Sequence, residues 1–237
     1  MIKSDVMPGN FKFLGLLTVL NVAFQLISDV TAGKIIAVAG VGVSITVLYF
    51  PITYIMGDIL TEVYGYARAR YVVWLTLLAS VLAGITYQIV AFFPPAPFFA
   101  ADDAYRTVFF TVPRILLGGW LAVFCGDIAN DYILAKMKIW TNGRFLWARL
   151  VGSTIVGQGI NTILFYVIGL YGILPGNVLL QGILMGWFLK TMVEVIMTPV
   201  TYAVVRRLKT IENIDYYDRE TDFNPFRLQI EPKNNPS

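Results

Sequence analysis

The chain has 237 residues and a formal net charge of +3; 57% of its residues are hydrophobic and 14% are charged. With a mean hydropathy of +0.67, it is too apolar for a soluble domain with a single core, so we predict an integral membrane protein. The sequence has no histidine, one cysteine and no Walker-type phosphate loop, which argues against a transition-metal site, a cofactor and ATP hydrolysis by this chain. Its basic residues form short clusters between apolar runs, so we expect no nucleic-acid surface.

Six apolar runs have the length, about 20 residues, that a helix needs to cross a bilayer core of roughly 30 Å. They are residues 13–32, 35–56, 71–93, 113–135, 148–170 and 178–205. Unbroken apolar runs do not alternate as the strands of a membrane barrel must. The sequence therefore predicts an all-α integral membrane protein, a bundle of six transmembrane helices, with the first run retained as a helix.

Basic residues near the ends of these runs predict the orientation of the chain. Eleven lie on one side: Lys3, Lys12, Arg68, Arg70, Lys136, Lys138, Arg144, Arg149, Arg206, Arg207 and Lys209. Three lie on the other: Lys34, Arg106 and Arg114. By the positive-inside rule, both termini are cytoplasmic. We expect a cytoplasmic N-terminus over residues 1–12, the six-helix domain over 13–209, and a cytoplasmic C-terminal tail of low order over 210–237.

Polar side chains inside the runs share helix faces and mark the candidate site. They are Asn21, Gln25, Asp58, Glu62, Asp127, Asp131, Gln158, Asn161, Trp187, Lys190 and Glu194. A charge near the centre of a transmembrane helix costs about 2.5–3.5 kcal/mol, so Lys190 and Glu194 indicate a working site inside the membrane. Because the acids outnumber the lysine, we expect a proton or a cationic ligand to balance the surplus.

Several of these residues also have a structural interpretation. Asn21, Gln25 and Gln158 could be interhelical hydrogen-bond partners, worth about 0.6–2 kcal/mol each. The two acids of the second run could lie at the cytoplasmic interface. Lys190 and Glu194 could neutralise one another as an i, i+4 pair.

Two motifs give the chain a resemblance to a known family. Residues 57–65 read Gly-Asp-Ile-Leu-Thr-Glu-Val-Tyr-Gly, and residues 153–158 read Ser-Thr-Ile-Val-Gly-Gln. Further matches are Asp127 through Asp131, Lys136, Lys138, Arg149, Lys190, Thr198-Pro199 and Tyr202. Over residues 13–209 the chain resembles the queuosine-precursor transporter family, also grouped with the vitamin uptake transporters. Asn161 stands where an Asp is common in that family.

The resemblance implies a multi-pass importer in the inner (plasma) membrane that takes up queuosine precursors for tRNA queuosine salvage. These are 7-deazaguanine compounds: preQ0, preQ1 or queuine. A carboxylate of Asp58, Glu62 or Asp127 would accept the adjacent N1–H and N2–H groups of such a nucleobase-like substrate. Lys190 would donate to its acceptors, together with the amides of Gln158 and Asn161, and Trp187 would stack on the ring.

Other functions stay open at this stage. The chain could carry another planar heterocycle, such as a purine, a pterin or a vitamin, or it could be a substrate-capture subunit that needs a partner module. An enzyme is not expected, because the sequence has no strong nucleophile motif and no metal set. The sequence also leaves open whether the protein is a homodimer, for which the small residues Gly152, Ser153 and Gly157 are a weak signal, and whether uptake is proton-coupled.

Overall fold

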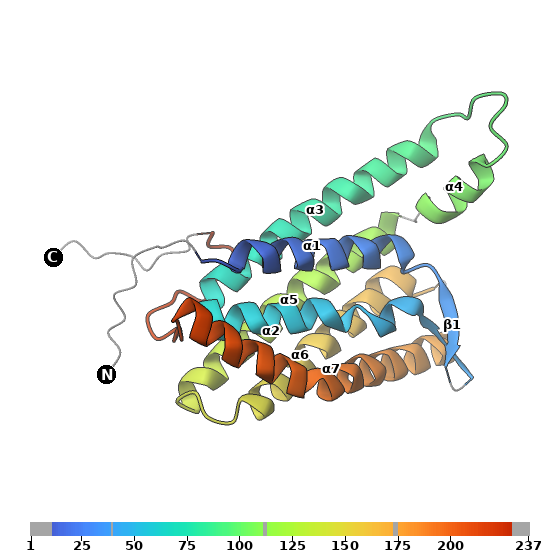
Figure 1. Cartoon of the computed structure of the whole chain (residues 1–237). Coiled ribbons are helices and arrows are strands. Elements are labelled where there is room, and N and C mark those ends of the chain that lie inside the picture. The colour runs from blue at the N-terminus through green and yellow to red at the C-terminus, as the bar shows by residue number, and fades with distance from the viewer. Residues whose placement is uncertain (1–10, 39, 111–112, 173–174, 229–237) are drawn as a thin grey trace.

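The computed structural model describes residues 11–38, 40–110, 113–172 and 175–228. The chain forms a bundle of helices with a short β-hairpin at one end (Figure 1). The helices are α1 (Leu14–Thr31), α2 (Pro51–Tyr64), α3 (Tyr66–Phe92), α4 (Asp102–Phe109), α5 (Pro113–Trp140), α6 (Leu146–Leu164) and α7 (Gly176–Glu212). The hairpin is β1 (Ile35–Val38) and β2 (Val41–Ser44); the one-turn helix η1 (Ile45–Leu48) precedes α2, and the π-helical turn η2 (Phe165–Leu170) continues α6.

Four of the described helices are long and apolar enough to cross a membrane: α1, α3, α6 with η2, and α7. The pair α4 and α5 forms a fifth, bent candidate. The protein is thus a helical, multi-pass membrane protein. Helix α2 has 14 residues and a length of about 21 Å, which is less than the hydrocarbon core of a bilayer. The structure therefore supports four or five spans and does not confirm six.

The second predicted span, residues 35–56, is wrong. Residues 35–38 and 41–44 pair as an antiparallel hairpin, with Ile35 paired to Ser44 and Val38 to Val41. β-Branched residues dominate this stretch and favour strands, and an apolar run alone does not separate a strand from a helix. The helix begins only at Pro51, a residue suited to the first helical turn because its missing N–H would have no partner there.

The described ends of the chain meet at the end of the bundle opposite the hairpin (Figure 1). The carboxylate of Glu212, at the end of α7, accepts the backbone N–H groups of Lys12 and Phe13 at 3.1 and 2.8 Å. This arrangement requires an even number of passes through the bundle. That this end faces the cytoplasm stays a prediction from the basic residues, of which Lys3 lies outside the described part.

Helices α5 and α6 cross at very close range. A Cβ atom at Gly157 would lie 2.7 Å from Cβ of Asn130 and 3.0 Å from the carbonyl oxygen of Gly126. Only glycine fits there, as is typical where membrane helices approach closely. Gly157 and Ser153 are buried and Gly152 lies against Met137, so these small residues pack within the chain and do not indicate a homodimer.

Residues 213–228, here called the C-terminal segment, are ordered against the bundle, so the expected low order is wrong for this part of the tail. Asp218 accepts the backbone N–H of Tyr66 through both carboxylate oxygens, at 3.1 and 3.0 Å. Arg70 donates to two backbone carbonyls of the segment at 2.8 and 2.7 Å, and Trp74 donates to a third at 2.9 Å. The carboxylate of Asp218 and the backbone carbonyls of the segment thus hold it against α3. Residues 1–10 and 229–237 lie outside the described part.

Candidate functional site

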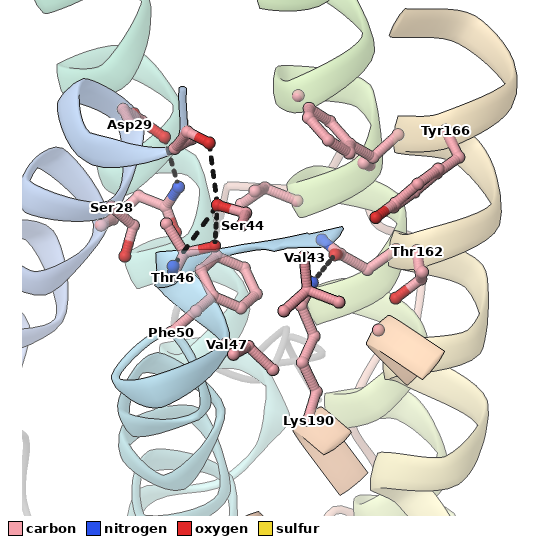
Figure 2. A pocket seen from close by; sticks show the side chains of 18 residues that line it. Ser28, Asp29, Val43, Ser44, Thr46, Val47, Phe50, Thr162, Tyr166 and Lys190 are labelled. Atoms are coloured by element: carbon pink, nitrogen blue, oxygen red, sulfur yellow. Dashed lines mark hydrogen bonds between the residues drawn. The ribbon is translucent and has the colours of Figure 1, made fainter. Parts of the chain in front are cut away.

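A cavity of about 670 Å³, partly open to solvent, lies in the half of the bundle nearest the hairpin. We call it the larger cavity. Its polar lining comes from α1, the hairpin, η1, α6, η2 and α7: Gln25, Ser28, Asp29, Ser44, Thr46, Asn161, Thr162, Tyr166 and Lys190. Figure 2 shows Ser28 and Asp29 on one side and Thr162, Tyr166 and Lys190 on the other.

Lys190 extends along one wall of the larger cavity. Its Nζ donates to Oδ1 of Asn161 at 3.0 Å and lies 4.5 Å from the ring centroid of Phe50. Both partners are neutral, and a cation over an aromatic face is attracted by the ring. Within the described residues no carboxylate lies within ion-pair distance of Lys190, so its charge is available to a ligand in the cavity.

The α1 wall offers hydrogen-bond acceptors. Gln25 donates through Nε2 to Oδ1 of Asp29 at 2.7 Å, and a second residue, Ser80, borders that carboxylate from α3. A carboxylate has about four lone-pair positions, so Asp29 keeps capacity for a ligand. Oε1 of Gln25 and the hydroxyl of Ser28 are buried without a hydrogen-bond partner in the described structure. Buried polar atoms of this kind cost about 1–3 kcal/mol each when unpaired, so this wall favours a ligand that donates.

Aromatic side chains give the larger cavity flat surfaces. Phe50 lies at the start of α2, and Phe165 and Tyr166 belong to the π-helical turn η2. Such wide turns are rare and occur often at functional sites, because they re-aim side chains that a regular helix would place elsewhere. The cavity can therefore accommodate a planar ring with polar edges.

A second, smaller cavity of about 270 Å³ lies between α1, α2, α3 and α5. We call it the smaller cavity. Its polar lining is Asn21, Thr53, Tyr54, Asp127, Asn130 and Asp131. Asp131 accepts the hydroxyl of Thr61 at 2.8 Å. Asn130 donates to Oδ1 of Asp58, a fully buried residue behind the cavity, at 2.7 Å.

Glu194 joins these acids from α7. It accepts the hydroxyl of Thr154, and its carboxyl group contacts that of Asp58. Lys190, one turn before it on α7, bonds Asn161 instead, and no ion pair between Lys190 and Glu194 is present among the described residues. We define the acid cluster as Asp58, Asp127, Asp131 and Glu194.

Glu62 lies elsewhere, near the end of the bundle where the C-terminal segment packs. It is fully buried among three basic groups: Nη2 of Arg149 at 2.9 Å, Nζ of Lys209 at 2.6 Å and Nζ of Lys138 at 3.5 Å. Both lysines also contact Asp215 of the C-terminal segment, at 2.7 and 2.9 Å. These five residues form an ion cluster that joins α2, α5, α6 and α7 to that segment.

The charges of the ion cluster act on Asp215 in opposite directions. Burial by itself would raise the pKa of this carboxyl, but the ammonium groups of Lys138 and Lys209 outweigh it and hold the pKa below its ordinary value of 3.8. Asp215 therefore stays ionised at neutral pH and holds both lysines in place.

The predicted site residues thus separate into groups. Gln25, Asn161 and Lys190 line the larger cavity, and Asn21, Asp127 and Asp131 line the smaller one. Asp58 and Glu194 complete the acid cluster, and Gln158 is fully buried. Five of the predicted residues line neither cavity: Asp58, Glu62, Gln158, Glu194 and Trp187. Trp187 donates to the carbonyl of Ile155 at 3.0 Å.

Sequence reasoning missed several residues of the larger cavity: Asp29, Ser44, Thr46, Phe50, Thr162 and Tyr166. Asp29 could have been found, because it stands four residues after Gln25 and continues the same face of α1. Ser44 and Thr46 could not, because they were assigned to a helix that does not form. Nothing in the sequence predicted the wide turn that brings Tyr166 to the cavity.

Comparison with known proteins identifies the family. Residues 44–204 match the family described as "Putative vitamin uptake transporter". Over 156 residues, 65% of this chain and 68% of the relative, the sequence is 32% identical to the Bacillus subtilis (strain 168) protein named "Probable queuosine precursor transporter". The chain belongs to this transporter family. No solved structure matches it.

Membership in the vitamin uptake transporter family implies a small-molecule substrate and, at the level of the family, a transporter rather than an enzyme. The matched residues, 44–204, contain both acids of the conspicuous 57–65 motif and every predicted site residue except Asn21 and Gln25. The α1 wall of the larger cavity therefore lies outside the matched region of the transporter.

Proposed function

We propose that this transporter imports queuosine precursors (preQ0, preQ1 or queuine) across the cell's inner membrane and binds them in the larger cavity. The relative's name suggests this class of substrate. The observation that carries the proposal is that a cationic donor, Lys190, and the acceptors of Gln25 and Asp29 line the same cavity from different helices. Lys190 and Asp29 lie on different sides of it (Figure 2).

The donor edge of a 7-deazaguanine fits the α1 wall. Its N1–H and N2–H groups are adjacent, and a carboxylate accepts two such bonds side by side with added strength from its charge. Asp29 is the acid of the larger cavity, so it takes the role that the sequence suggested for Asp58, Glu62 or Asp127. Oε1 of Gln25 is a further acceptor.

The acceptor edge of the base fits the opposite wall. The carbonyl oxygen O6 would accept from Nζ of Lys190 and from the hydroxyl of Thr162, which is buried without a hydrogen-bond partner in the described structure. The ring would stack on Phe50 or Tyr166. Stacking of a base on an aromatic side chain is worth about 1–3 kcal/mol in other proteins.

Uptake of radiolabelled queuine or preQ1 into cells without their own salvage transporter tests the proposal. Asp29→Asn and Lys190→Gln should each lower the initial rate at least tenfold at equal protein level, because each removes one charged hydrogen bond, worth about 1.5–3 kcal/mol. Asp102→Asn is the matched control: its side chain pairs with Arg106 on α4, away from both cavities, and uptake should not change. Wild-type rates in both cavity variants would overturn the assignment.

A second candidate is uptake of another planar heterocycle, which the description of the family favours. The same cavity would accept a pterin or a purine by the same two edges. Competition of unlabelled pterins, purines and vitamins against labelled queuine separates the candidates: the proposal expects that only 7-deazaguanines compete at low micromolar concentrations.

A further inference from the structure

The smaller cavity is surrounded by hydrogen-bond acceptors that lack donors. Four of its lining oxygens are buried without a partner in the described structure: Oδ1 of Asn21, Asp127 and Asn130, and Oδ2 of Asp131. Asn21, Asn130 and Asp131 are 4%, 1% and 1% exposed. An acceptor in such a position loses its water without compensation. The set therefore indicates a ligand that can satisfy several oxygens at once.

The donors in the same wall are already used. Thr53 donates to the carbonyl of Phe50 at 2.7 Å, and Tyr54 donates to the carbonyl of Gly157 at 3.3 Å. The Asn130 amide donates through Nδ2 to Asp58, which fixes its orientation and leaves Oδ1 as the free atom. Asn21 likewise donates through Nδ2 to Thr76 at 3.3 Å. Carboxylate and amide oxygens without competing donors are the ligands of a small hard cation.

The charge around the smaller cavity also indicates a cation. Tyr54, Asp127 and Asp131 line the smaller cavity, and α1 contributes the neutral amide of Asn21. Further titratable groups interact electrostatically with these residues: Asp58 of α2, Tyr66 of α3, Lys190 and Glu194 of α7, and Asp218 of the C-terminal segment. Asp58 and Glu194 contact each other. The acids around the smaller cavity outnumber Lys190. A bound cation would reduce this surplus of negative charge.

The two cavities are stacked one helical turn apart on three helices. Gln25, Phe50 and Val123 line the larger cavity, and the residues one turn away on the same helices, Asn21, Tyr54 and Asp127, line the smaller one. Four residues along a helix span about 6 Å. Asp127 also faces Lys190 electrostatically, so an event in one cavity changes the charge felt in the other.

We propose that the smaller cavity binds a monovalent cation, Na⁺ or a proton held as hydronium, and that this cation drives substrate uptake. Lys190 forms no ion pair with Asp127, but the charge of that carboxylate acts on the ammonium group through space. The cation offsets this charge, so the ammonium group binds the substrate in the larger cavity more strongly. By linkage, substrate bound at Lys190 strengthens cation binding to the same degree. The coupling step rests on the proposed function; the cation site itself does not.

Purified full-length protein in liposomes tests the coupling. Labelled queuine uptake is compared under an inward Na⁺ gradient, an inward proton gradient and no gradient, with equilibrium exchange as the reference. One of the two gradients should raise the initial rate above exchange at least tenfold, and which gradient does so identifies the cation. The ratio of the gradient-driven initial rate to the exchange rate should fall to about one in Asp131→Asn and in Asn21→Leu. Asp102→Asn should keep the wild-type ratio. A wild-type ratio in both cavity variants, or exchange without a response to either gradient, would overturn the inference.

Absence of queuine exchange in the wild type would overturn the proposed function. A measurement without substrate is therefore needed to test the cation site independently of the proposed function. The melting temperature of the detergent-solubilised protein is recorded in NaCl and in choline chloride, and across pH 5 to 8. A cation that binds only the folded state raises the melting temperature with its concentration. The wild type should respond to Na⁺ or to pH, and Asp131→Asn should lose that response; equal responses in both would overturn the site.

Discussion

Buried charge has two different uses in this molecule, and Glu62 and Lys190 represent them. Glu62 is surrounded by three basic groups, so its charge is satisfied within the chain. Lys190 has neutral partners and faces a cavity. A buried charge with complete partners indicates structure, and one without them indicates a ligand.

Glu62→Gln should therefore impair folding rather than substrate recognition. Loss of one partner from a buried ion cluster costs about 3–5 kcal/mol. The variant should therefore give a lower yield of folded protein by size-exclusion chromatography and a lower melting temperature in detergent. Glu220→Gln, an exposed acid of the C-terminal segment, is the control and should behave as the wild type. A Glu62→Gln protein of normal stability that has lost uptake would restore Glu62 to the substrate site.

Asp29 should serve the precursors alike. The aminomethyl precursor preQ1 and the nitrile preQ0 differ at C7, away from the N1–H and N2–H edge that Asp29 accepts in the proposed pose. In Asp29→Asn, uptake of preQ1 and of preQ0 should therefore fall by a similar factor, measured with the two labelled compounds in the same cells. A loss at least fivefold greater for the cation preQ1 would show that Asp29 faces the aminomethyl group and not the base edge.

At the scale of elements, the crossing of α5 and α6 places Asn130 and Asn161 beside the two cavities. Gly157→Ala should lower the melting temperature, because its new methyl group would lie 2.7 Å from Asn130 and overpacking of this kind costs about 1–3 kcal/mol. Gly159→Ala, two residues further, is the matched control: its nearest neighbour, Trp187, would lie at 3.6 Å, an ordinary contact. Equal melting temperatures for the two variants would contradict this packing.

The C-terminal segment should loosen in acid. The pKa of Asp215 is depressed in the folded protein by Lys138 and Lys209, although burial opposes this. Its contribution to stability is therefore present above the pKa of the unfolded state, about 3.9, and is lost as the pH falls through the lower folded value. Between pH 6 and pH 3 the melting temperature of the wild type should fall further than that of Asp215→Asn. Identical pH profiles would show that the pairing contributes nothing.

Prediction from the sequence succeeded where one physical signal dominated. Long apolar runs with polar residues at helical spacing identified α1, α3, α5, α6 and α7. Gln25, Asn161 and Lys190 come from three different helices and line the larger cavity, and their role in substrate binding stays a prediction. The prediction of a helix over residues 35–56 was wrong because an unbroken apolar run shows neither the repeat of a helix nor that of a strand. The β-branched residues at its start pair as strands. The C-terminal segment was missed because its polar groups bond to α3 across more than 150 positions, which composition does not reveal.

At the scale of the whole molecule, the polar interior is arranged in layers along the bundle. The larger cavity lies nearest the hairpin, the smaller cavity and the acid cluster follow about one helical turn further along α1, α2 and α5, and the ion cluster with the C-terminal segment closes the end where the described termini meet. If the basic residues place that end in the cytoplasm, the larger cavity lies towards the outside, where import begins.

The most direct test of the central claim is an experimental structure of the protein with queuine bound. We predict density for one flat ligand in the larger cavity, with its N1–H and N2–H edge at Asp29 and its carbonyl oxygen within hydrogen-bond distance of Nζ of Lys190. Density in the smaller cavity or on the lipid-facing surface, with the larger cavity free of ligand at saturating queuine, would contradict the account.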